Sequence, residues 1–549
     1  MQAETLYQWL KDVATRYREH VALVSHEAAA RREWTYLAFV EAVERAAGGL
    51  QALGYGRGQA LAVWLPNTVE WLVMEFAGAM LGLLVVPLNT RYRAHELGHL
   101  LRLSRARGLV FMPRFLNIDF AGILEEVLSE DGSELALEHV FVTGTDPSAV
   151  RVGSPAKPVA VHALGEVLAG RPAEEEAFPH DLVNVFGTSG TTSAPKLAAH
   201  DQASIVRHAE AMARAFALGE GERTLGLLPF CGVYGFCAAF SVLAAGGTLI
   251  PVPAFDARRV AALMADESVT FQPMSHIMLR QILDLEDFDF ARLRSWTRGT
   301  YATLNRPQEL AERAFRTIGV RLTNVYGSSE AFAMMTHWPW DDPLEQRSLP
   351  GGHVVSDDIR VRAVDLGTGA VLPPRVSGEI QLQGYNVLTQ YLGNPNATAE
   401  AFTPDGWFRT GDQGYVLDDR TFVLENRLKD TIRLRGFLVS PTEIEEFLLQ
   451  HPAVEMAQVV GVNLRPEEDD VAVAFVKRKP GQETTEEALR LFCKERLASF
   501  KLPSRFVFVE EYPMTPSANG DKVQKVKLRE WARAILTGAE PSAVTKVVP

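Results

Sequence analysis

The stretch Leu182-Val-Asn-Val-Phe-Gly-Thr-Ser-Gly-Thr-Thr-Ser-Ala-Pro-Lys196 joins an apolar run to a loop of small, hydroxyl-bearing residues. The run 182–186 has the length and composition of a buried strand. Behind it, five hydroxyl residues and a glycine fill positions 188–193, and Lys196 follows. Exposed backbone N–H groups, hydroxyl groups and a lysine charge together suit an anion such as a polyphosphate. The alternative interpretation is a Ser/Thr-rich surface turn.

This loop differs from two others that carry similar residues. A Walker loop ends in Gly-Lys-Ser/Thr, and no such tripeptide follows Gly187 at the required spacing. The nucleophile elbow of hydrolases, Gly-x-Ser-x-Gly, is absent both here and at Tyr326-Gly-Ser-Ser-Glu330. The sequence therefore indicates an anion cradle of a third kind.

Helix-period and strand-period segments alternate on both sides of this loop. Helical spacing of apolar residues covers 39–53 and 71–84. Short apolar runs typical of buried strands lie at 60–65, 84–88, 225–229, 248–252, 270–274 and 321–326. This succession predicts mostly parallel sheets that are covered by helices on both faces and arranged as two βα-layered subdomains.

The pattern changes in the last third of the chain. Between about 350 and 425, short strands broken by glycine and proline predict an antiparallel, barrel-like region. After it come amphipathic helices at 442–450 and 485–498 and strands at 456–462 and 471–476. We therefore expect an α/β protein whose large N-terminal domain, 1–428, carries the two subdomains and a small β-barrel. A small mobile α+β C-terminal domain, 429–549, would follow.

The composition is that of a globular protein and argues against several partners. Of the 549 residues, 47% are hydrophobic and 22% are charged, which excludes a disordered chain. The formal net charge of −13 offers no footprint for nucleic acid or an anionic membrane surface. The longest apolar stretch, 71–88, contains Glu75 and Pro87 and is too short to cross a bilayer. Since the N-terminus shows no export signal, we expect a cytoplasmic protein without a membrane span.

Only three cysteines occur, Cys231, Cys237 and Cys493, and their sequence surroundings are apolar. They are too few and too scattered for a disulfide framework or a zinc knuckle. We expect them to be buried, reduced thiols.

The hydroxyl-rich loop resembles the phosphate-binding signature of the adenylate-forming superfamily, which comprises acyl-CoA synthetases, peptide-synthetase adenylation domains and beetle luciferases. Further segments match the family in the right order over nearly the whole chain. They are Tyr326-Gly-Ser-Ser-Glu330, Trp407-Phe-Arg-Thr-Gly-Asp412, Asn426-Arg-Leu-Lys-Asp430 and Lys522-Val-Gln-Lys-Val-Lys-Leu-Arg529. The agreement of five ordered motifs identifies the chain as a member of this superfamily.

The resemblance implies a nucleotide site. The loop would bind the phosphates through Thr188, Ser189, Gly190, Thr191, Thr192, Ser193 and Lys196. The ring of Tyr326 would lie on adenine, and Glu330 together with Thr191 would hold Mg²⁺ near the phosphates. Asp412 would accept hydrogen bonds from the ribose hydroxyls, beside Arg427. Further nucleotide-binding positions are Gly299, Thr300, Tyr301, Asn324, Gly327, Ser328 and Ser329.

Catalysis would depend on Lys522, with Glu330 and Thr191 as its metal-binding partners. The resemblance makes Lys522 the cation that bridges the carboxylate substrate and the α-phosphate and neutralises the charge that grows on phosphorus. The loop before Lys522 is slightly longer than the usual family spacing. The assignment therefore relies on the match downstream, which includes Lys525.

Each of these charged residues also has a purely structural interpretation. Glu330 could be a carboxylate at a helix N-terminus, and Asp412 could cap a turn. Arg427 could be a surface cation paired with Asp430, and Lys522 could belong to a solvated basic tail.

The resemblance further implies that the C-terminal domain rotates about a hinge at Lys429 between two half-reactions. Gly436, within Arg433-Leu-Arg-Gly-Phe-Leu438, would then leave space for the pantetheine arm of coenzyme A. The acyl pocket would include Gly232, Val233, Tyr234, Ala302 and Ala331. The family usually has a histidine or another ring where Gly232 stands, which predicts a roomier or differently gated entrance here.

We therefore predict an AMP-forming acid–thiol ligase, an acyl-CoA synthetase, that uses ATP, Mg²⁺ and coenzyme A. The predicted pocket segments are apolar or small and bring no second cation, so the acid should be a hydrophobic monocarboxylic acid. Two alternatives stay open: a stand-alone enzyme that loads a carrier protein, and a catalytically silent nucleotide-binding protein. The sequence does not indicate an oligomeric state.

Overall fold

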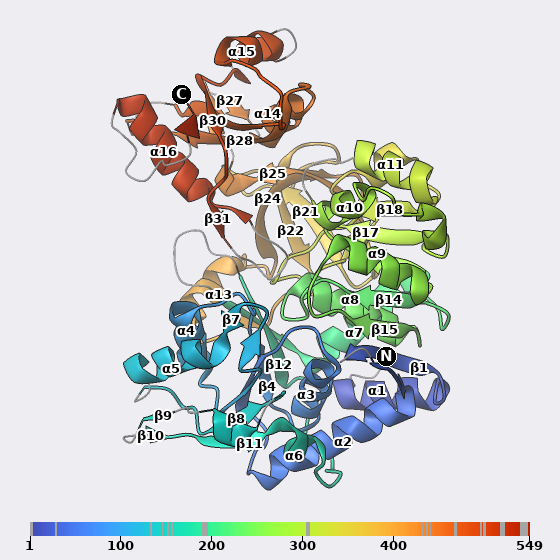
Figure 1. Ribbon diagram of the computed structural model, residues 1–549. Helices are drawn as coiled ribbons and strands as arrows, with labels where there is room; N and C mark the ends of the chain where they lie inside the picture. The colour runs from blue at the N-terminus through green and yellow to red at the C-terminus, as the bar shows by residue number, and fades with distance from the viewer. Residues whose placement is uncertain are drawn as a thin grey trace.

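Two parts of unequal size make up the molecule, a large one built from the N-terminal segments and a smaller C-terminal one (Figure 1). The computed structural model describes residues 4–27, 30–131, 134–144, 146–150, 153–154, 157–188, 196–303, 308–430, 432–434, 437–439, 441–465, 469–494, 497, 501–515, 522–538 and 547–548. Within these ranges the predicted mixed α/β architecture is confirmed. None of the helices in them combines the length and hydrophobicity that a transmembrane segment requires.

An eight-stranded sheet forms the centre of the large part. Its strand order is β11 (Ala160–Ala163), β8 (His139–Val142), β5 (Gly108–Phe111), β3 (Ala60–Trp64), β4 (Leu84–Pro87), β12 (Leu182–Gly187), β13 (Leu197–Asp201) and β23 (Gln390–Tyr391). All pairs from β11 to β12 are parallel, whereas β13 runs antiparallel to both of its neighbours. The predicted phosphate loop is therefore the connection of the hairpin β12–β13.

Helices cover both faces of this sheet and of the neighbouring one. The longer helices of the large part are α1 (Leu6–Arg16), α2 (Tyr36–Ala52), α3 (Val69–Met80), α4 (Ala94–Ser104), α5 (Phe120–Asp131), α7 (Gln202–Ala215), α8 (Val233–Ala244), α9 (Ala257–Asp266), α10 (His276–Leu283) and α11 (Gln308–Ile318). Alternate side chains of β3 point to opposite faces. Leu61 and Val63 share a core with α2 and α3, whereas Ala62 and Trp64 share one with α4 and α5.

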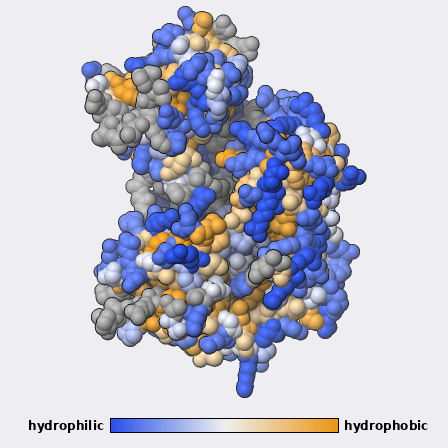
Figure 2. Space-filling view, in the orientation of Figure 1, coloured by the Kyte–Doolittle hydropathy of each residue, from blue (hydrophilic) through white to orange (hydrophobic). Residues whose placement is uncertain are grey.

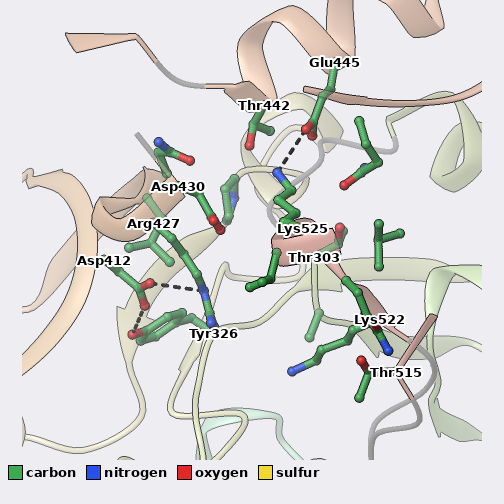
Figure 3. A pocket seen from close by; sticks show the side chains of 18 of the residues that line it. Thr303, Tyr326, Asp412, Arg427, Asp430, Thr442, Glu445, Thr515, Lys522 and Lys525 are labelled. Atoms are coloured by element: carbon green, nitrogen blue, oxygen red, sulfur yellow. Dashed lines mark hydrogen bonds and ion pairs between the residues drawn. The ribbon is translucent and has the colours of Figure 1, made fainter. Parts of the chain in front are cut away.

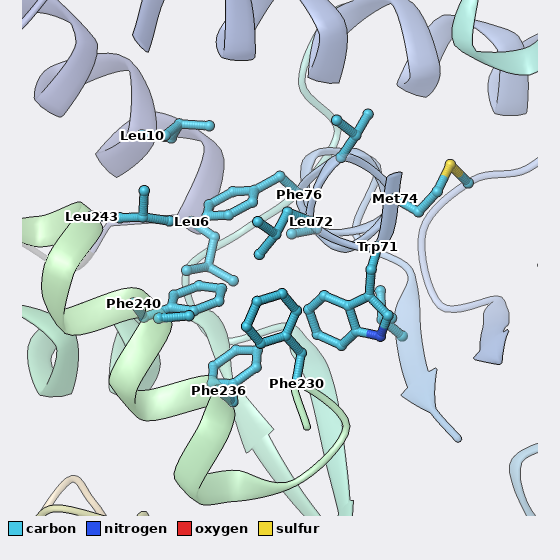
Figure 4. Close-up of a cluster of buried hydrophobic side chains, with 14 of the residues drawn as sticks. Leu6, Leu10, Trp71, Leu72, Met74, Phe76, Phe230, Phe236, Phe240 and Leu243 are labelled. Atoms are coloured by element: carbon cyan, nitrogen blue, oxygen red, sulfur yellow. The ribbon is translucent and has the colours of Figure 1, made fainter. Parts of the chain in front are cut away.

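The core beneath the predicted phosphate loop is rich in aromatic rings (Figure 4). It forms where α1, α3 and α8 meet, and Figure 4 shows Phe76 of α3 facing Phe240 of α8. These two rings stack with centroids 5.2 Å apart, and Phe236 stacks on Phe240 at 4.0 Å. Phe186, the last apolar residue before the loop, meets Phe236 edge-on at 5.2 Å. Burial of these large rings stabilises the strand end that carries the loop.

A second set of strands lies beside the first. It comprises β14 (Arg223–Gly226), β15 (Thr248–Pro251), β1 (Val21–Glu27) and β2 (Ala30–Thr35) in that order, and the parallel trio β16 (Phe271–Pro273), β17 (Arg298–Tyr301) and β18 (Arg321–Asn324). The N–H of Thr270 donates to the carbonyl of Arg223 at 3.0 Å, and the Gln272 amide bonds both backbone groups of Leu225 at 3.0 Å. These bonds join the two groups of strands, so the second βα layer is confirmed.

The region from 350 to 427 is antiparallel, as predicted. Its sheet has the order β19 (Thr336–His337), β20 (Gly351–Val354), β25 (Thr421–Arg427), β24 (Phe408–Val416), β22 (Gly378–Gln383) and β21 (Arg360–Val364). Within the described residues, β19 and β21 are edge strands and do not pair with each other. The antiparallel sheet is therefore confirmed, whereas its closure into a barrel is not.

The C-terminal part is an α+β unit. Its sheet has the order β28 (Val454–Val462), β29 (Val471–Arg478), β30 (Arg505–Val509) and β33 (Val547–Val548), with helices α14 (Pro441–Leu449), α15 (Glu486–Lys494) and α16 (Lys525–Thr537). A short hairpin, β31 (Met514–Thr515) and β32 (Lys522–Val523), extends from it toward the large part (Figure 1). Hydrophilic side chains cover much of the surface of both parts (Figure 2).

Some predicted element ends are wrong for local reasons. Helix α3 ends at Met80 rather than at 84, because Gly82 adopts a left-handed φ of 65° and turns the chain into β4. Strand β14 ends at Gly226 rather than at 229. The three cysteines are buried and free, as predicted.

Candidate active site

A cavity of about 750 Å³ lies between the two parts of the molecule. The large part lines it with Ala302, Thr303, Tyr326, Gly327, Asp412 and Arg427, and the C-terminal part with Thr442, Glu445, Gln458, Thr515, Lys522 and Lys525. Figure 3 shows Tyr326, Asp412 and Arg427 on one side and Lys522 on the other. Segments from distant positions in the sequence thus meet in one cavity.

Asp412 lies between two other predicted nucleotide-binding residues. The hydroxyl of Tyr326 donates a hydrogen bond to Oδ2 of Asp412 over 2.7 Å, and Nε of Arg427 lies 3.4 Å from Oδ1. Asp412 and Arg427 face each other across the antiparallel pair β24–β25. The Asp412 carboxylate raises the pKa of Arg427, while burial and the same carboxylate raise the pKa of Tyr326. Both donors therefore keep their protons, and Arg427 pairs with Asp412.

Asn324 supports the cavity wall from behind. Its side chain is fully buried at the end of β18. Oδ1 accepts from the N–H of Thr303 at 3.1 Å, and Nδ2 donates to the carbonyl of Thr303 at 2.9 Å. The predicted nucleotide-binding residue Asn324 thus fixes the backbone of Thr303, and Thr303 faces the cavity.

The turn that carries Glu330 is fixed to the hairpin β12–β13. The Ser329 hydroxyl donates to the carbonyl of Gly187 at 3.1 Å, and Nε2 of His200 donates to the carbonyl of Ser329 at 2.8 Å. Burial lowers the pKa of His200 to about 4, so its ring is neutral at physiological pH. The N–H of Leu388 donates to the carbonyl of Glu330 at 2.7 Å. Glu330 is therefore held beside the strand end where the predicted phosphate loop begins.

The base of that loop is closed by its own backbone. The N–H of Thr188 donates to the carbonyl of Lys196 over 2.8 Å. Thr188 and Lys196 are both half-buried. The predicted phosphate-binding residues between them, Ser189, Gly190, Thr191, Thr192 and Ser193, lie outside the described residues.

The donor set near Glu330 fits a magnesium ion that is held mainly by phosphates. Mg²⁺ prefers hard oxygen ligands and commonly takes one or two carboxylates together with substrate phosphates and water. Glu330 supplies one half-buried carboxylate. Over the described ranges, no group of three or more His, Cys, Asp and Glu side chains could form a metal cage.

Three lysines of the C-terminal part line the cavity, Lys522, Lys525 and Lys527, and the first two differ in their surroundings. Lys522 is exposed and lies opposite Thr515 in the hairpin β31–β32. Nζ of Lys525 lies 3.0 Å from Oε1 of Glu445, which is 4% exposed and also accepts from the N–H of Val459 at 2.8 Å. Lys525 is therefore part of a buried ion pair within the C-terminal part.

The predicted hinge lies in the 3₁₀ turn Leu428–Asp430. The carboxylate of Asp430 accepts from Nη2 of Arg529 in α16 at 2.9 Å. Asp430 thus pairs with Arg529, and Arg427 pairs with Asp412, although the charge of Asp430 also contributes to the raised pKa of Arg427. Gly436 lies outside the described residues.

Several predicted site residues do not line the cavity. Gly299, Thr300 and Tyr301 are buried in β17, and a Cβ at Gly299 would lie 2.5 Å from the carbonyl oxygen of Gln272. The Thr300 and Tyr234 hydroxyls are 2.8 Å apart in a hydrogen bond. Of the predicted acyl-pocket residues, only Ala302 lines this cavity. Gly232 caps the N-terminus of α8, and Val233, Tyr234 and Ala331 are buried.

Thr303 falls within the predicted pocket segment 299–304, whereas Glu445 was not among the predicted site residues. Glu445 lies three residues after Thr442 on an amphipathic helix, at a position that is buried. The available signal was a charged residue on the apolar face of the predicted helix. Its partner, Lys525, is too distant in the sequence for the pair to be predicted.

Known proteins resemble this chain along nearly its whole length. The family model for AMP-binding enzymes matches residues 10–392, and the model for the AMP-binding enzyme C-terminal domain matches residues 443–519. A Bacillus subtilis (strain 168) protein named as an acyl-CoA synthetase, YngI, is 30% identical over 543 residues, which cover 96% of each chain. The mitochondrial medium-chain acyl-CoA ligase ACSF2 of Homo sapiens is 30% identical over 550 residues, 96% of this chain and 88% of that protein.

A solved structure supports the same assignment of the fold. ATP-bound MatB from Rhodopseudomonas palustris superimposes with a TM-score of 0.82 at 24% identity, covering 96% of this chain and 99% of that one. The fold matches that of this solved structure, and the two family models and the relatives define the class as adenylate-forming enzymes. The chain belongs to the AMP-binding enzyme family and is an AMP-forming ligase, which confirms the resemblance seen in the sequence.

Proposed function

We propose that this enzyme adenylates a hydrophobic monocarboxylic acid with ATP and Mg²⁺ and then transfers the acyl group to coenzyme A, releasing AMP and pyrophosphate. One observation carries the proposal. The cavity brings the Tyr326–Asp412–Arg427 group of the large part opposite Lys522 of the C-terminal part. A polar site for a nucleoside and a cation for its phosphate thus share one space.

In the first half-reaction a carboxylate oxygen attacks the α-phosphorus of ATP, and the bond to the β-phosphate breaks as pyrophosphate leaves. Asp412 accepts hydrogen bonds from the ribose hydroxyls, and Arg427 pairs with that carboxylate. Lys522 neutralises the charge that grows on the α-phosphate. The loop between Thr188 and Lys196 holds the departing phosphates. Glu330 and Thr191 would hold Mg²⁺ when it is bound with the nucleotide, and the ion would supply positive charge against the phosphates.

In the second half-reaction a thiolate attacks the acyl carbon, and the bond from that carbon to the AMP oxygen breaks. We place the domain boundary between 428 and 429, with Lys429 as the pivot of the C-terminal domain. Rotation about it would withdraw Lys522 and bring Gly436 to the site, where a residue without a side chain leaves space for pantetheine.

The proposed acid is apolar because the sequence predicts its pocket at the segment that opens α8, and this segment is apolar. Val233 and Tyr234 are at most 5% exposed, and the Tyr234 hydroxyl is already bonded to Thr300. Gly232, the residue at the start of α8, has no side chain to narrow this region. One relative, the human ligase, is named for medium-chain acids, which supports the same class here.

A screen by ATP–pyrophosphate exchange tests the proposal. The purified enzyme is offered straight-chain acids of increasing length, aromatic acids and a dicarboxylic acid, each with ATP and Mg²⁺. We expect exchange with one group of apolar monocarboxylic acids and little with the dicarboxylic acid. The adenylate is then offered to coenzyme A and to a pantetheinylated carrier protein. Faster thioester formation on the carrier protein would identify that protein, rather than coenzyme A, as the acceptor. Absence of exchange with every acid would refute the proposal.

A further inference from the structure

Tyr391 contacts two predicted phosphate-site residues with two different parts of its side chain. Its hydroxyl donates a hydrogen bond to Oε1 of Glu330 over 3.0 Å. The face of its ring lies 4.9 Å from Nζ of Lys196, within the range of a cation–π contact. Neither contact follows from the sequence motifs. Tyr391 thus links the residue proposed to hold magnesium with the lysine at the end of the phosphate loop.

The Tyr391 side chain is itself firmly held. Tyr391 belongs to β23, which pairs with β13 through the partners Ala198 and Tyr391. The N–H of Tyr391 donates to the hydroxyl of Thr398 at 3.0 Å. The residue is 8% exposed and packs in a cluster with Leu388 and Phe408. Since β13 continues from the phosphate loop, this pairing fixes the Tyr391 ring to the strand that follows the loop.

The contacts of Tyr391 explain how Lys196 and Glu330 can serve the same phosphate group without pairing with each other. An ammonium and a carboxylate that serve one phosphate group would attract each other and cancel. In the described residues, Lys196 and Glu330 form no direct ion pair, and Tyr391 contacts both. Its hydroxyl orients the carboxylate and its π face holds the ammonium, so that both charges are preserved.

We propose that Tyr391 is a positioning residue that orients the Glu330 carboxylate toward magnesium and holds Lys196 for the polyphosphate. The inference rests on the proposed function and deepens it, because it assigns the geometry of the pyrophosphate side of the site to one side chain. In this proposal Tyr391 contacts neither the carboxylate oxygen of the substrate nor the α-phosphorus. It acts through Glu330 and Lys196.

The test separates the two contacts with two variants. Tyr391→Phe removes the hydroxyl and keeps the ring, whereas Tyr391→Leu removes both. Tyr7→Phe is the matched control, because the Tyr7 hydroxyl donates to a carboxylate, Oε1 of Glu44, at 2.8 Å far from the cavity. The first readout is ATP affinity by titration calorimetry, with magnesium and with EDTA. The second is the affinity for pyrophosphate without metal.

We expect Tyr391→Phe to bind ATP in EDTA as the wild type does. The factor by which magnesium increases ATP affinity should be about tenfold smaller in this variant than in the wild type. Tyr391→Leu should show the same reduction and should also bind metal-free pyrophosphate about fivefold more weakly. Tyr7→Phe should match the wild type in all three measurements. Equal magnesium-dependent gains in Tyr391→Phe and Tyr7→Phe would overturn the proposal.

A double-variant cycle distinguishes positioning from a general structural role. On a Glu330→Gln background, Tyr391→Phe should change the magnesium-dependent gain no further, because the hydroxyl acts through Glu330. Additive losses would contradict the proposal. The wild type is measured first, so failure of the proposed function, seen as no ATP binding at all, is separable from failure of Tyr391 alone.

Discussion

The Tyr326 hydroxyl and the Asp412 carboxylate are joined by a hydrogen bond of 2.7 Å in a buried part of the interdomain cavity. The bond occupies Oδ2, one of the two oxygens proposed to receive the ribose hydroxyls. The aromatic residue proposed for adenine and the acid proposed for ribose are therefore coupled before any nucleotide binds. This coupling leads to the first prediction.

Tyr326→Phe should destabilise the enzyme more without nucleotide than with it. The variant leaves Oδ2 of a buried carboxylate without its donor, which costs about 1–3 kcal/mol. Bound ATP supplies ribose hydroxyls and restores a partner, so the ATP-induced rise in the thermal midpoint should be larger than in the wild type. Differential scanning fluorimetry with and without ATP measures this, and an unchanged ATP-induced rise would contradict the assignment of Asp412 to ribose.

Lys522→Ala should impair only the first half-reaction. Loss of the cation at the α-phosphate should slow adenylate formation by about 10²- to 10³-fold. Thioester formation from a chemically prepared acyl-adenylate should continue at nearly the wild-type rate. Lys479→Ala, which removes an exposed charge from the same part of the chain, is the control. Equal loss of both half-reactions in Lys522→Ala would assign the lysine to structure instead.

Lys525 should behave differently from Lys522. Lys525→Met leaves the buried Glu445 carboxylate without its cation and should destabilise the C-terminal part by about 3 kcal/mol. Adding Glu445→Gln removes the buried charge and should recover most of that loss. Limited proteolysis of the C-terminal part and the thermal midpoint report the effect. If the double variant is no more stable than Lys525→Met alone, the unpaired Glu445 carboxylate is not the cause of the destabilisation.

The buried acid Glu75 should make stability depend on pH. Burial raises its pKa from 4.5 to about 8, although Nδ2 of Asn184 donates to its Oε1 at 2.9 Å. Within the described residues, Oε2 of Glu75 and Oδ1 of Asn184 have no partner when the acid is ionised. Protonation removes the buried charge and gives Oε2 a hydrogen to donate. The folded state thus binds this proton more tightly than the unfolded state, so the stabilisation is complete below pH 4.5 and is lost as pH rises toward 8.

Glu75→Gln tests this assignment, because its amide can donate to Asn184 at any pH. Between pH 4.5 and 8, the free energy of unfolding of the wild type should fall by up to about 1.4 kcal/mol per pH unit relative to that of the variant. Thermal midpoints of both proteins at pH 6 and pH 8.5 measure the difference. Parallel pH profiles would show that Glu75 does not titrate in this range.

Local patterns predicted most of the strands and helices, since buried strands such as β3 and β12 are short apolar runs with clear ends. The end of α3 was missed because only Gly82 in its left-handed conformation stops the helix, and the apolar run continues beyond it. Barrel closure was expected from strand spacing, but spacing does not determine which edges pair.

The motifs predicted the residues of the cavity better than their contacts. Tyr326, Asp412, Arg427 and Lys522 do meet around one space. The resemblance assigned Asn324 to the nucleotide, which stays a prediction, and it did not foresee the bonds between this amide and the backbone of Thr303. The hydroxyl of Tyr391 on Glu330 was not predicted, because the two residues are far apart in sequence and meet only when β23 joins the sheet.

The bond between Asp430 and Arg529 limits the proposed domain movement. Asp430 is the first residue after the pivot, and its carboxylate is attached to α16, the helix that follows Lys522. We therefore expect this pair to keep Asp430 with the C-terminal domain in the proposed movement. The backbone torsions that change would then lie around Leu428 and Lys429.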